Sequence, residues 1–245
     1  MVAPPQSTRY GLVGTAFDYL LRMFLELLNE GKCESHRWVA ELAIKGIPNL
    51  ERDTEELLDL TEKAKHMLVG AIQTYENYLK EGMIDDELIK CCIHLAQLDG
   101  IHRAGRVEED FGVAHEEDVT DLRNLIVSLT PADFYAFNHC ILNPTFGEAS
   151  QVIGGADADL ILDSCLIDIK TTKYLNIKQE YYHQLVGYVL LSRTVDNVPP
   201  VRSTGLYFSR YAQMYKFPLE EMASEEMWEE FYKWFIDLTF QVDKA

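Results

Sequence analysis

The sequence lacks the features that mark membrane-spanning, exported and zinc-binding proteins. No apolar run approaches the roughly 20 residues that a helix needs to span a bilayer. The first residues, MVAPPQSTRY, have no charged region followed by an apolar one, so we find no signal peptide. The five cysteines form no C-x-x-C pair, which argues against zinc and redox motifs and for reduced, mostly buried thiols. We therefore expect a cytoplasmic protein without a membrane partner.

Positive charge is also scarce. The formal net charge is -18, which argues against a protein that coats nucleic acid non-specifically. The distribution is uneven, because residues 170–216 carry seven basic and two acidic side chains, whereas acid concentrates in 51–62, 108–121 and 220–230. A basic face beside an acidic remainder allows one specific surface that binds phosphate.

The first 140 residues have mostly helical spacing. Apolar residues recur with the helical period over the ranges 12–30, 36–45, 51–81, 85–99 and 116–128. The segment that begins at Thr130-Pro131 is typical of the start of a further short helix. We expect residues 1–30 to give the first helix of a core, and residues 31–140 to form an inserted helical block.

The pattern changes after Asn143-Pro144. The expected elements are strands over 148–153, 157–162 and 165–170, a helix over 178–192, a second hairpin over 205–211 and 213–217, and a last helix over 219–240. We therefore expect an α/β fold in which residues 141–245 complete the core. Its mixed central sheet is flanked by helices, and the helical block lies beside it.

The hairpin over 157–170 concentrates charge among apolar residues. With Asp163-Ser164 as a two-residue turn, Asp159 lies directly across from Asp168. Lys170 shares a face with Asp168 because side chains alternate along a strand, and Asp157 would face Lys170. Charges on such a sheet are costly unless they are paired or bound to metal.

Two carboxylates at short separation form a hard oxygen site for Mg²⁺ or Mn²⁺. Such an ion polarises a phosphodiester and lowers the pKa of a bound water, while a lysine stabilises charge in the transition state. The competing interpretation is an ion-paired surface hairpin with solvated aspartates.

The helix over 178–192 adds two polar residues to an apolar stripe. Gln184 and Tyr188 are four residues apart and share the stripe with Tyr181 and Leu191. Either they complete a functional site, or they form a pair that is satisfied within the core.

Together these segments resemble the PD-(D/E)xK nuclease superfamily, and more closely its RecB-like, lambda-exonuclease-like branch. The resemblance rests on the ordered set Gly-Ala-Asp-Ala-Asp-Leu-Ile, then Asp168-Ile169-Lys170, then Gln184-x-x-x-Tyr188, over about 40 residues. It implies a restriction-endonuclease-like core and a Mg²⁺- or Mn²⁺-dependent nuclease, an exonuclease or an endonuclease, that acts on DNA more readily than on RNA. The implied catalytic residues are Asp159, Asp168, Lys170, Gln184 and Tyr188.

The implied metal ligands are Asp168, the backbone carbonyl of Ile169, and one aspartate of the first strand. Asp159 gives the better cross-strand register, whereas Asp157 follows a Gly154-x-x-Asp pattern that many relatives share, so both remain candidates.

The branch also has a G-T-x-x-H pattern on its first helix, with a metal-binding histidine. Here Gly14-Thr15 is followed by Asp18 at the histidine position. Aspartate also binds hard cations, so Asp18 is a further candidate ligand; alternatively it is an exposed residue paired with Arg22. Some relatives hold an iron–sulfur cluster, but no cysteine follows Cys165, so we expect none here.

Further residues are assigned more loosely. Lys173, Lys178 and His183 are candidates for substrate binding. Four aromatic residues near the C-terminus are expected to pack in the core rather than to stack on bases: Trp228, Tyr232, Trp234 and Phe235.

Two functional hypotheses follow. The first is an active nuclease; the second is a non-catalytic subunit of the same fold that binds nucleic acid or takes part in assembly. The intact acidic, lysine and Gln-x-x-x-Tyr set favours the first, and the net negative charge leaves room for a protein partner or a homo-oligomer. A small-molecule metallohydrolase would need an H-x-H or H-E-x-x-H pattern, which the chain lacks.

Overall fold

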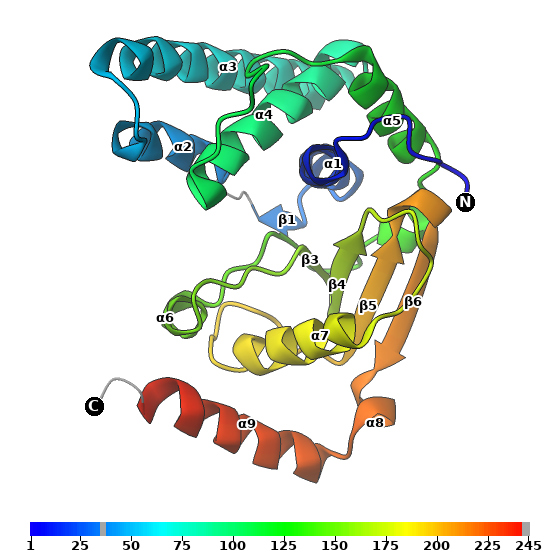
Figure 1. Cartoon of the computed structure of the whole chain (residues 1–245). Helices are drawn as coiled ribbons and strands as arrows, with labels where there is room; N and C mark the ends of the chain where they lie inside the picture. The colour runs from blue at the N-terminus through cyan, green and yellow to red at the C-terminus, as the bar shows by residue number, and fades with distance from the viewer. Residues whose placement is uncertain (35–37, 242–245) are drawn as a thin grey trace.

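A mixed β-sheet lies at the centre of the molecule (Figure 1). The computed structural model describes residues 1–34 and 38–241. In this part of the chain the sheet has six strands in sequential order: β1 (Cys33–Glu34), β2 (Cys140–Leu142), β3 (Leu160–Leu162), β4 (Cys165–Lys170), β5 (Ser203–Phe208) and β6 (Gln213–Pro218). The pairs β1–β2 and β4–β5 are parallel and the other three are antiparallel. The predicted α/β class with a mixed, helix-flanked sheet is therefore confirmed.

The β3–β4 hairpin has the predicted two-residue turn. Leu162 pairs with Cys165, so Asp163 and Ser164 form the connection. Asp163 adopts a positive φ of 54°, a conformation that Asp and Asn tolerate better than most residues. Its carboxylate accepts hydrogen bonds from the backbone N–H groups of Phe137, Asn138 and His139. The turn is thus fixed to the segment that leads into β2.

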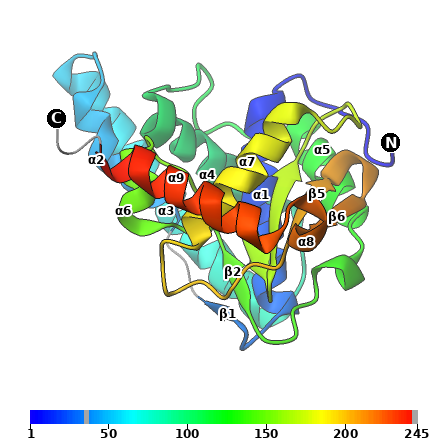
Figure 2. The same cartoon turned by 90° about the horizontal axis from the view of Figure 1, so that it is seen from below.

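One face of the sheet is covered by α7 (Gln179–Ser192), and α9 (Glu225–Gln241) lies beyond it (Figures 1 and 2). Helix α7 is the crossover that parallel strands such as β4 and β5 require. Leu185 and Val189 of α7 are buried in one apolar cluster with Leu166 and Leu206 of the sheet. This cluster fixes the position of α7 over β4 and β5.

The opposite face of the sheet meets the helical block (Figure 1). The block consists of α2 (Ala40–Gly46), η1 (Ile47–Asn49), α3 (Thr54–Glu81), α4 (Asp86–Ala104), α5 (Glu116–Val127) and η2 (Pro131–Phe134), and α1 (Tyr10–Leu28) packs against it. Asp53 and Asp85 cap α3 and α4, because their carboxylates accept from N–H groups in the first turn. Helix α1 contacts α4, α5 and β2, so it lies between the block and the sheet. Residues 36 and 37 of the helix expected over 36–45 lie outside the described residues.

Several predicted elements were wrong. Residues 148–153 do not form a strand, since Gly147–Val152 is the short helix α6. A segment of six residues is too short for its side-chain pattern to separate strand from helix. Here the Ser150 hydroxyl bonds both the N–H and the carbonyl of Ala156, which closes a compact loop. Strands β1 and β2 were not predicted, because two or three residues are too short to show alternation.

The C-terminal third also differs in detail. Strand β5 ends at Phe208 and is followed by η3 (Ser209–Tyr211), and the last helix is divided into α8 (Leu219–Met222) and α9. Ser224 separates α8 from α9, and its hydroxyl accepts from the backbone N–H of Met227. Trp228 and Phe235 are buried as expected, but the core position predicted for Trp234 is wrong, since its side chain is exposed. No helix in residues 1–34 and 38–241 is both long and apolar enough to cross a membrane.

A buried ion pair joins the helical block to the end of β5. The Arg210 guanidinium donates to both carboxylate oxygens of Asp121 on α5, at 2.7 and 3.1 Å, and both side chains are fully buried. The same guanidinium donates to the Ala3 carbonyl, and the Arg210 carbonyl accepts from the Val2 and Ala3 N–H groups. Three segments that are distant in sequence therefore meet at this one pair.

We predict that Asp121→Ala lowers the free energy of unfolding by about 3–5 kcal/mol, because it leaves a buried arginine without its partner. Arg123→Ala is the matched control, since Arg123 lies two residues away in an exposed pair with Asp86 and should cost about 0–1 kcal/mol. Urea denaturation of the two variants measures the difference. Equal losses would show that the Arg210–Asp121 pair does not hold the block to the sheet.

Candidate active site

A continuous chain of polar contacts runs from β4 to α7. The Lys170 ammonium lies 2.6 Å from a carboxylate oxygen of Asp168 and donates to the Gln184 side-chain carbonyl at 2.8 Å. The Gln184 amide then donates to the Tyr188 hydroxyl at 2.8 Å. The structure thus brings together four of the five predicted catalytic residues in one network.

The fifth residue, Asp159, lies across the hairpin. The β3–β4 register pairs Leu160 with Ile167, and its continuation by one residue places Asp159 opposite Asp168. One Asp159 oxygen accepts from the Ile169 N–H at 2.5 Å. Asp168 is only 2% exposed, so the alternative of a surface hairpin with solvated aspartates is wrong for this residue.

Burial makes these carboxylates difficult to ionise. Desolvation, followed by the charges of Asp168 and Asp18, raises the pKa of Asp159 well above its usual value. Desolvation also raises the pKa of Asp168, although the Lys170 charge opposes the shift. Burial raises the pKa of Tyr188 to about 12, so its hydroxyl stays protonated at neutral pH. Ionising Asp159 and Asp168 is therefore costly in this structure unless a further positive charge lies beside them.

Helix α1 adds a third acidic group, Asp18, at this site. Asp18 pairs with Arg22 one turn later, as the alternative interpretation expected, but its side chain is only 25% exposed. Its other carboxylate oxygen is buried and has no hydrogen-bond partner among the described residues. The Arg22 guanidinium also lies over the Tyr19 ring, at 4.6 Å from the centroid. Burial raises the pKa of Asp18, although the Arg22 charge opposes the shift.

A cavity of about 370 Å³ opens between α1 and the hairpin. Its lining includes four of the five predicted metal ligands, but not Asp168: Tyr10, Gly11, Gly14, Thr15, Asp18, Asp99, Arg103, Asn143, Asp157, Asp159, Ile169 and Thr171. A second cavity, of about 580 Å³, shares Arg103, Asn143 and Asp157 with the first. Asp157 forms an isolated β-bridge with Thr145 and lines both cavities, so it lies at their junction.

Sequence analysis missed Asp99, Arg103 and Asn143. Asp99 is almost fully buried, accepts from the Tyr19 hydroxyl at 3.0 Å, and pairs with Arg103 at 2.6 Å. The available signal was an aspartate inside a largely apolar helix. Its partners could not be inferred, because Tyr19 is 80 residues away in the sequence.

The three candidates for substrate binding lie at the surface of the protein. Lys173, Lys178 and His183 are exposed, and the first two lie in the segment between β4 and α7. The Lys173 ammonium lies near the rings of Tyr10 and Tyr174, and that of Lys178 lies 5.9 Å from the Tyr181 ring. Tyr181 also contacts Lys170 through its ring face, so these cations lie close to the polar network.

The donor set suits a hard divalent cation. The carboxylates of Asp159 and Asp168, which lie across the hairpin from each other, and the unpartnered oxygen on Asp18 are oxygen ligands of the type that Mg²⁺ and Mn²⁺ prefer, and Ile169 lines the cavity beside them. In the described part of the chain, no three His, Cys, Asp or Glu side chains form a group arranged to hold a metal ion. A metal held here would therefore depend on the Asp159–Asp168 pair, together with backbone and water oxygens.

Comparisons with models of protein families, with curated proteins and with solved structures give no significant match for this chain. The site residues are therefore assigned from the sequence pattern and the geometry alone.

We predict that Asp159→Asn stabilises the protein at about pH 7.5 in the absence of divalent ions. A carboxyl whose pKa is raised on folding destabilises the native state increasingly as pH rises from its unfolded to its folded pKa. The amide removes this charge but keeps an acceptor for the Ile169 N–H. The melting temperature should rise by about 2–4 °C for each kcal/mol gained, and the gain should vanish near pH 4.

Asp163→Asn is the matched control, and its expected effect on stability at neutral pH is opposite to that of Asp159→Asn. Burial opposes ionisation of Asp163, but three backbone donors outweigh it and lower its pKa, so its charge stabilises the fold above the unfolded pKa. Asparagine tolerates the positive φ, so this variant should destabilise the protein at neutral pH, and less so as pH falls. If Asp159→Asn instead lowers the melting temperature at pH 7.5, the claim that burial makes ionisation of Asp159 costly is wrong.

Proposed function

We propose that this chain is a metal-dependent nuclease of the PD-(D/E)xK superfamily, in its RecB-like branch, with a restriction-endonuclease-like core. One observation carries the proposal: Asp168, Lys170, Gln184 and Tyr188 form a continuous polar network, and Asp159 lies across from Asp168. A purely structural role would not require three buried or half-buried charges on one hairpin, because such charges usually destabilise a fold.

The metal would be held by Asp159, Asp168 and the Ile169 carbonyl, with Asp18 and Asp157 as further candidate ligands on the cavity wall. When bound, Mg²⁺ or Mn²⁺ supplies a Lewis acid that polarises the phosphodiester and lowers the pKa of a water molecule. Such a cation would favour the ionised forms of Asp159 and Asp168, whose pKa values burial raises.

The protein's own groups do the remaining work. The Lys170 ammonium lies between Asp168 and Gln184, where it can stabilise negative charge that develops on a phosphate oxygen. The Gln184 side-chain carbonyl accepts a hydrogen bond from that ammonium and so restricts its direction, and the Tyr188 hydroxyl fixes Gln184 by accepting from its amide N–H. Gln184 and Tyr188 are thus positioning residues for Lys170.

The substrate is a nucleic acid, and DNA is favoured over RNA by the resemblance. Lys173, Lys178 and His183 are exposed beside the network, where they can contact phosphates. The net charge of -18 restricts such contacts to this strip, which favours a specific approach over broad coating.

We predict cleavage of labelled single- or double-stranded DNA in the presence of Mg²⁺ or Mn²⁺ and its loss in Asp168→Asn. The substitution removes the charge that both the metal and Lys170 require, while the amide keeps the size of the side chain. Divalent ions should also raise the melting temperature of the wild-type protein, since they bind only the folded state. Gel assays and thermal melts test both expectations.

Asp59→Asn, on an exposed turn of α3, is the control and should cleave like the wild type. Cleavage that persists in Asp168→Asn, or in a chelator, would refute the proposal. DNA binding without cleavage under every metal condition would favour the non-catalytic alternative, a binding or assembly subunit.

We predict that Lys170→Ala lowers the cleavage rate by about 10²-fold or more with little change in substrate affinity, because its charge acts mainly in the transition state. Gln184→Ala and Tyr188→Phe should give smaller losses that vary between substrates. Single-turnover kinetics separate the rate from binding, and circular dichroism checks the fold. If Tyr188→Phe and Gln184→Ala both fold and cleave every substrate at the wild-type rate, the two residues form only a core pair.

A further inference from the structure

Helix α9 has two apolar faces, and only one of them is used by the fold. Trp228, Phe235 and Thr239 are buried, and the Trp228 indole N–H donates to the Leu219 carbonyl at 3.1 Å. The Tyr232 hydroxyl donates to the Arg193 carbonyl at 3.2 Å. These contacts hold α9 beside α7, and none of them involves the second apolar face of α9.

The second face is an exposed stripe with helical spacing. Met227, Phe231, Trp234 and Leu238 follow one another at intervals of four, three and four residues, and are 59%, 41%, 53% and 55% exposed. The rings of Phe231 and Trp234 stack, with centroids 5.2 Å apart and an interplanar angle of 9°. Exposed apolar side chains are ordinary when scattered, but a contiguous row of large ones marks an interaction site.

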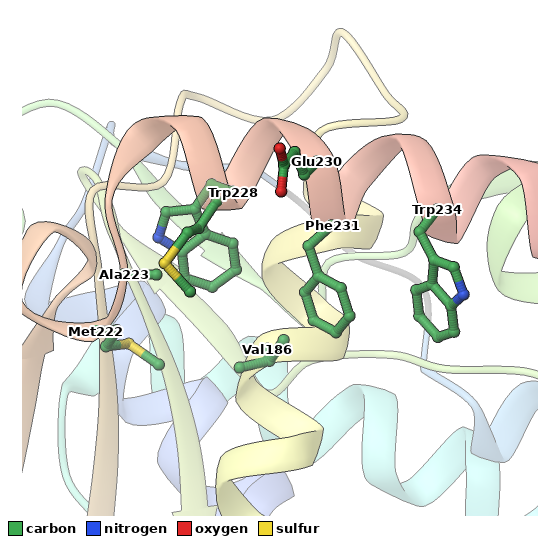
Figure 3. Close-up of a pocket in the computed structure, with 8 residues that line it drawn as sticks. Val186, Met222, Ala223, Trp228, Glu230, Phe231 and Trp234 are labelled. Carbon is green, nitrogen blue, oxygen red and sulfur yellow. The ribbon is translucent and has the colours of Figure 1, made fainter.

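Three residues of the stripe, Met227, Phe231 and Trp234, line an apolar groove of about 490 Å³. Its other lining residues include Val186 of α7, together with Met222 and Ala223 at the end of α8. Figure 3 shows Trp228, Phe231 and Trp234 in a row along α9, with Val186 on the neighbouring helix. Aromatic residues and methionines are enriched where proteins dock, because they offer large and adaptable contact surfaces.

The rim of the groove is acidic. Glu226, Glu230 and Asp237 follow the stripe along one side of α9, and Glu220 and Glu221 lie on α8. Lys233 is the single basic residue of α9. Negative charge on this rim repels nucleic-acid phosphates, and it would also repel the same rim of a second copy in a two-fold pair. It attracts a cationic partner.

We propose that this groove binds a basic amphipathic helix of a partner protein. The apolar side of such a helix, with large residues at i, i+3, i+4 and i+7, would lie in the groove against Phe231 and Trp234. Its lysines and arginines would face the carboxylates of Glu226 and Glu230. The site is separate from the proposed nuclease network and does not depend on that activity.

The test uses the whole chain and a fluorescent synthetic peptide of about 18 residues, long enough to form a helix on binding. The peptide has leucine at i, i+3, i+4 and i+7 and lysine elsewhere. Two control peptides are a scrambled version of the same composition and a version with glutamate in place of lysine. Fluorescence anisotropy should give a micromolar dissociation constant for the first peptide and binding at least about tenfold weaker for both controls, equivalent to 1.4 kcal/mol.

The variants locate the binding site. F231S/W234S, and the milder W234S alone, should weaken binding by about tenfold or more, as expected for aromatic anchors. E226Q/E230Q should weaken it less, and added salt should do the same in the wild type. L58S/V127S alters two exposed apolar residues elsewhere and should bind like the wild type, as should Asp168→Asn.

Three results would overturn the proposal. The first is no binding, or equal binding of the scrambled peptide or of folded F231S/W234S. The second is sedimentation showing a dimer that F231S/W234S dissociates, which assigns the groove to a second copy. The third is a labelled DNA oligonucleotide that binds the wild type directly and loses its binding in folded F231S/W234S, which assigns the groove to nucleic acid.

Discussion

The ion pair between Asp168 and Lys170 lies within the fold, where a carboxylate is tolerated only if its charge is compensated. That requirement accounts for much of the surrounding structure. Lys170 needs a further acceptor for its ammonium, which Gln184 provides, and the Gln184 amide needs a partner, which Tyr188 provides. Helix α7 must therefore cross the sheet at a fixed height and rotation, and its apolar contacts with Leu166 and Leu206 set that position.

On the face of the sheet opposite α7, the need to compensate buried charge extends into the helical block. Asp18 faces the cavity from α1 and depends on Arg22, whose guanidinium is itself buried beside Tyr19. Tyr19 then links to Asp99 on α4. The block is thus part of the site and not only a cover for it. The Arg210–Asp121 pair joins the block to the sheet again at the end of β5.

The parts of this arrangement that sequence could predict are those fixed by local geometry. The Asp163-Ser164 turn sets the hairpin register, and the register alone places Asp159 across from Asp168. Alternation along β4 places Lys170 with Asp168, and helical spacing places Gln184 with Tyr188. The contact between these two pairs depends on where α7 packs on the sheet. The family resemblance implied that position, but no local sequence pattern could predict it. Asp99, Arg103 and Asn143 reach the cavity through tertiary packing, and β1 and β2 are strands only because the sheet pairs them.

The distribution of charge gives the two surfaces different chemistry. Around the network, Lys173 and Lys178 lie within an otherwise acidic molecule, so a polyanion would be drawn to that strip and repelled elsewhere. Around α9, carboxylates border a row of exposed aromatic side chains, so a polyanion is excluded and a cationic helix is favoured. Helix α7 contributes to both surfaces, with Gln184 in the network and Val186 in the groove. A partner that shifted α7 would therefore act on the contact between Gln184 and Lys170, because both surfaces share this one rigid element.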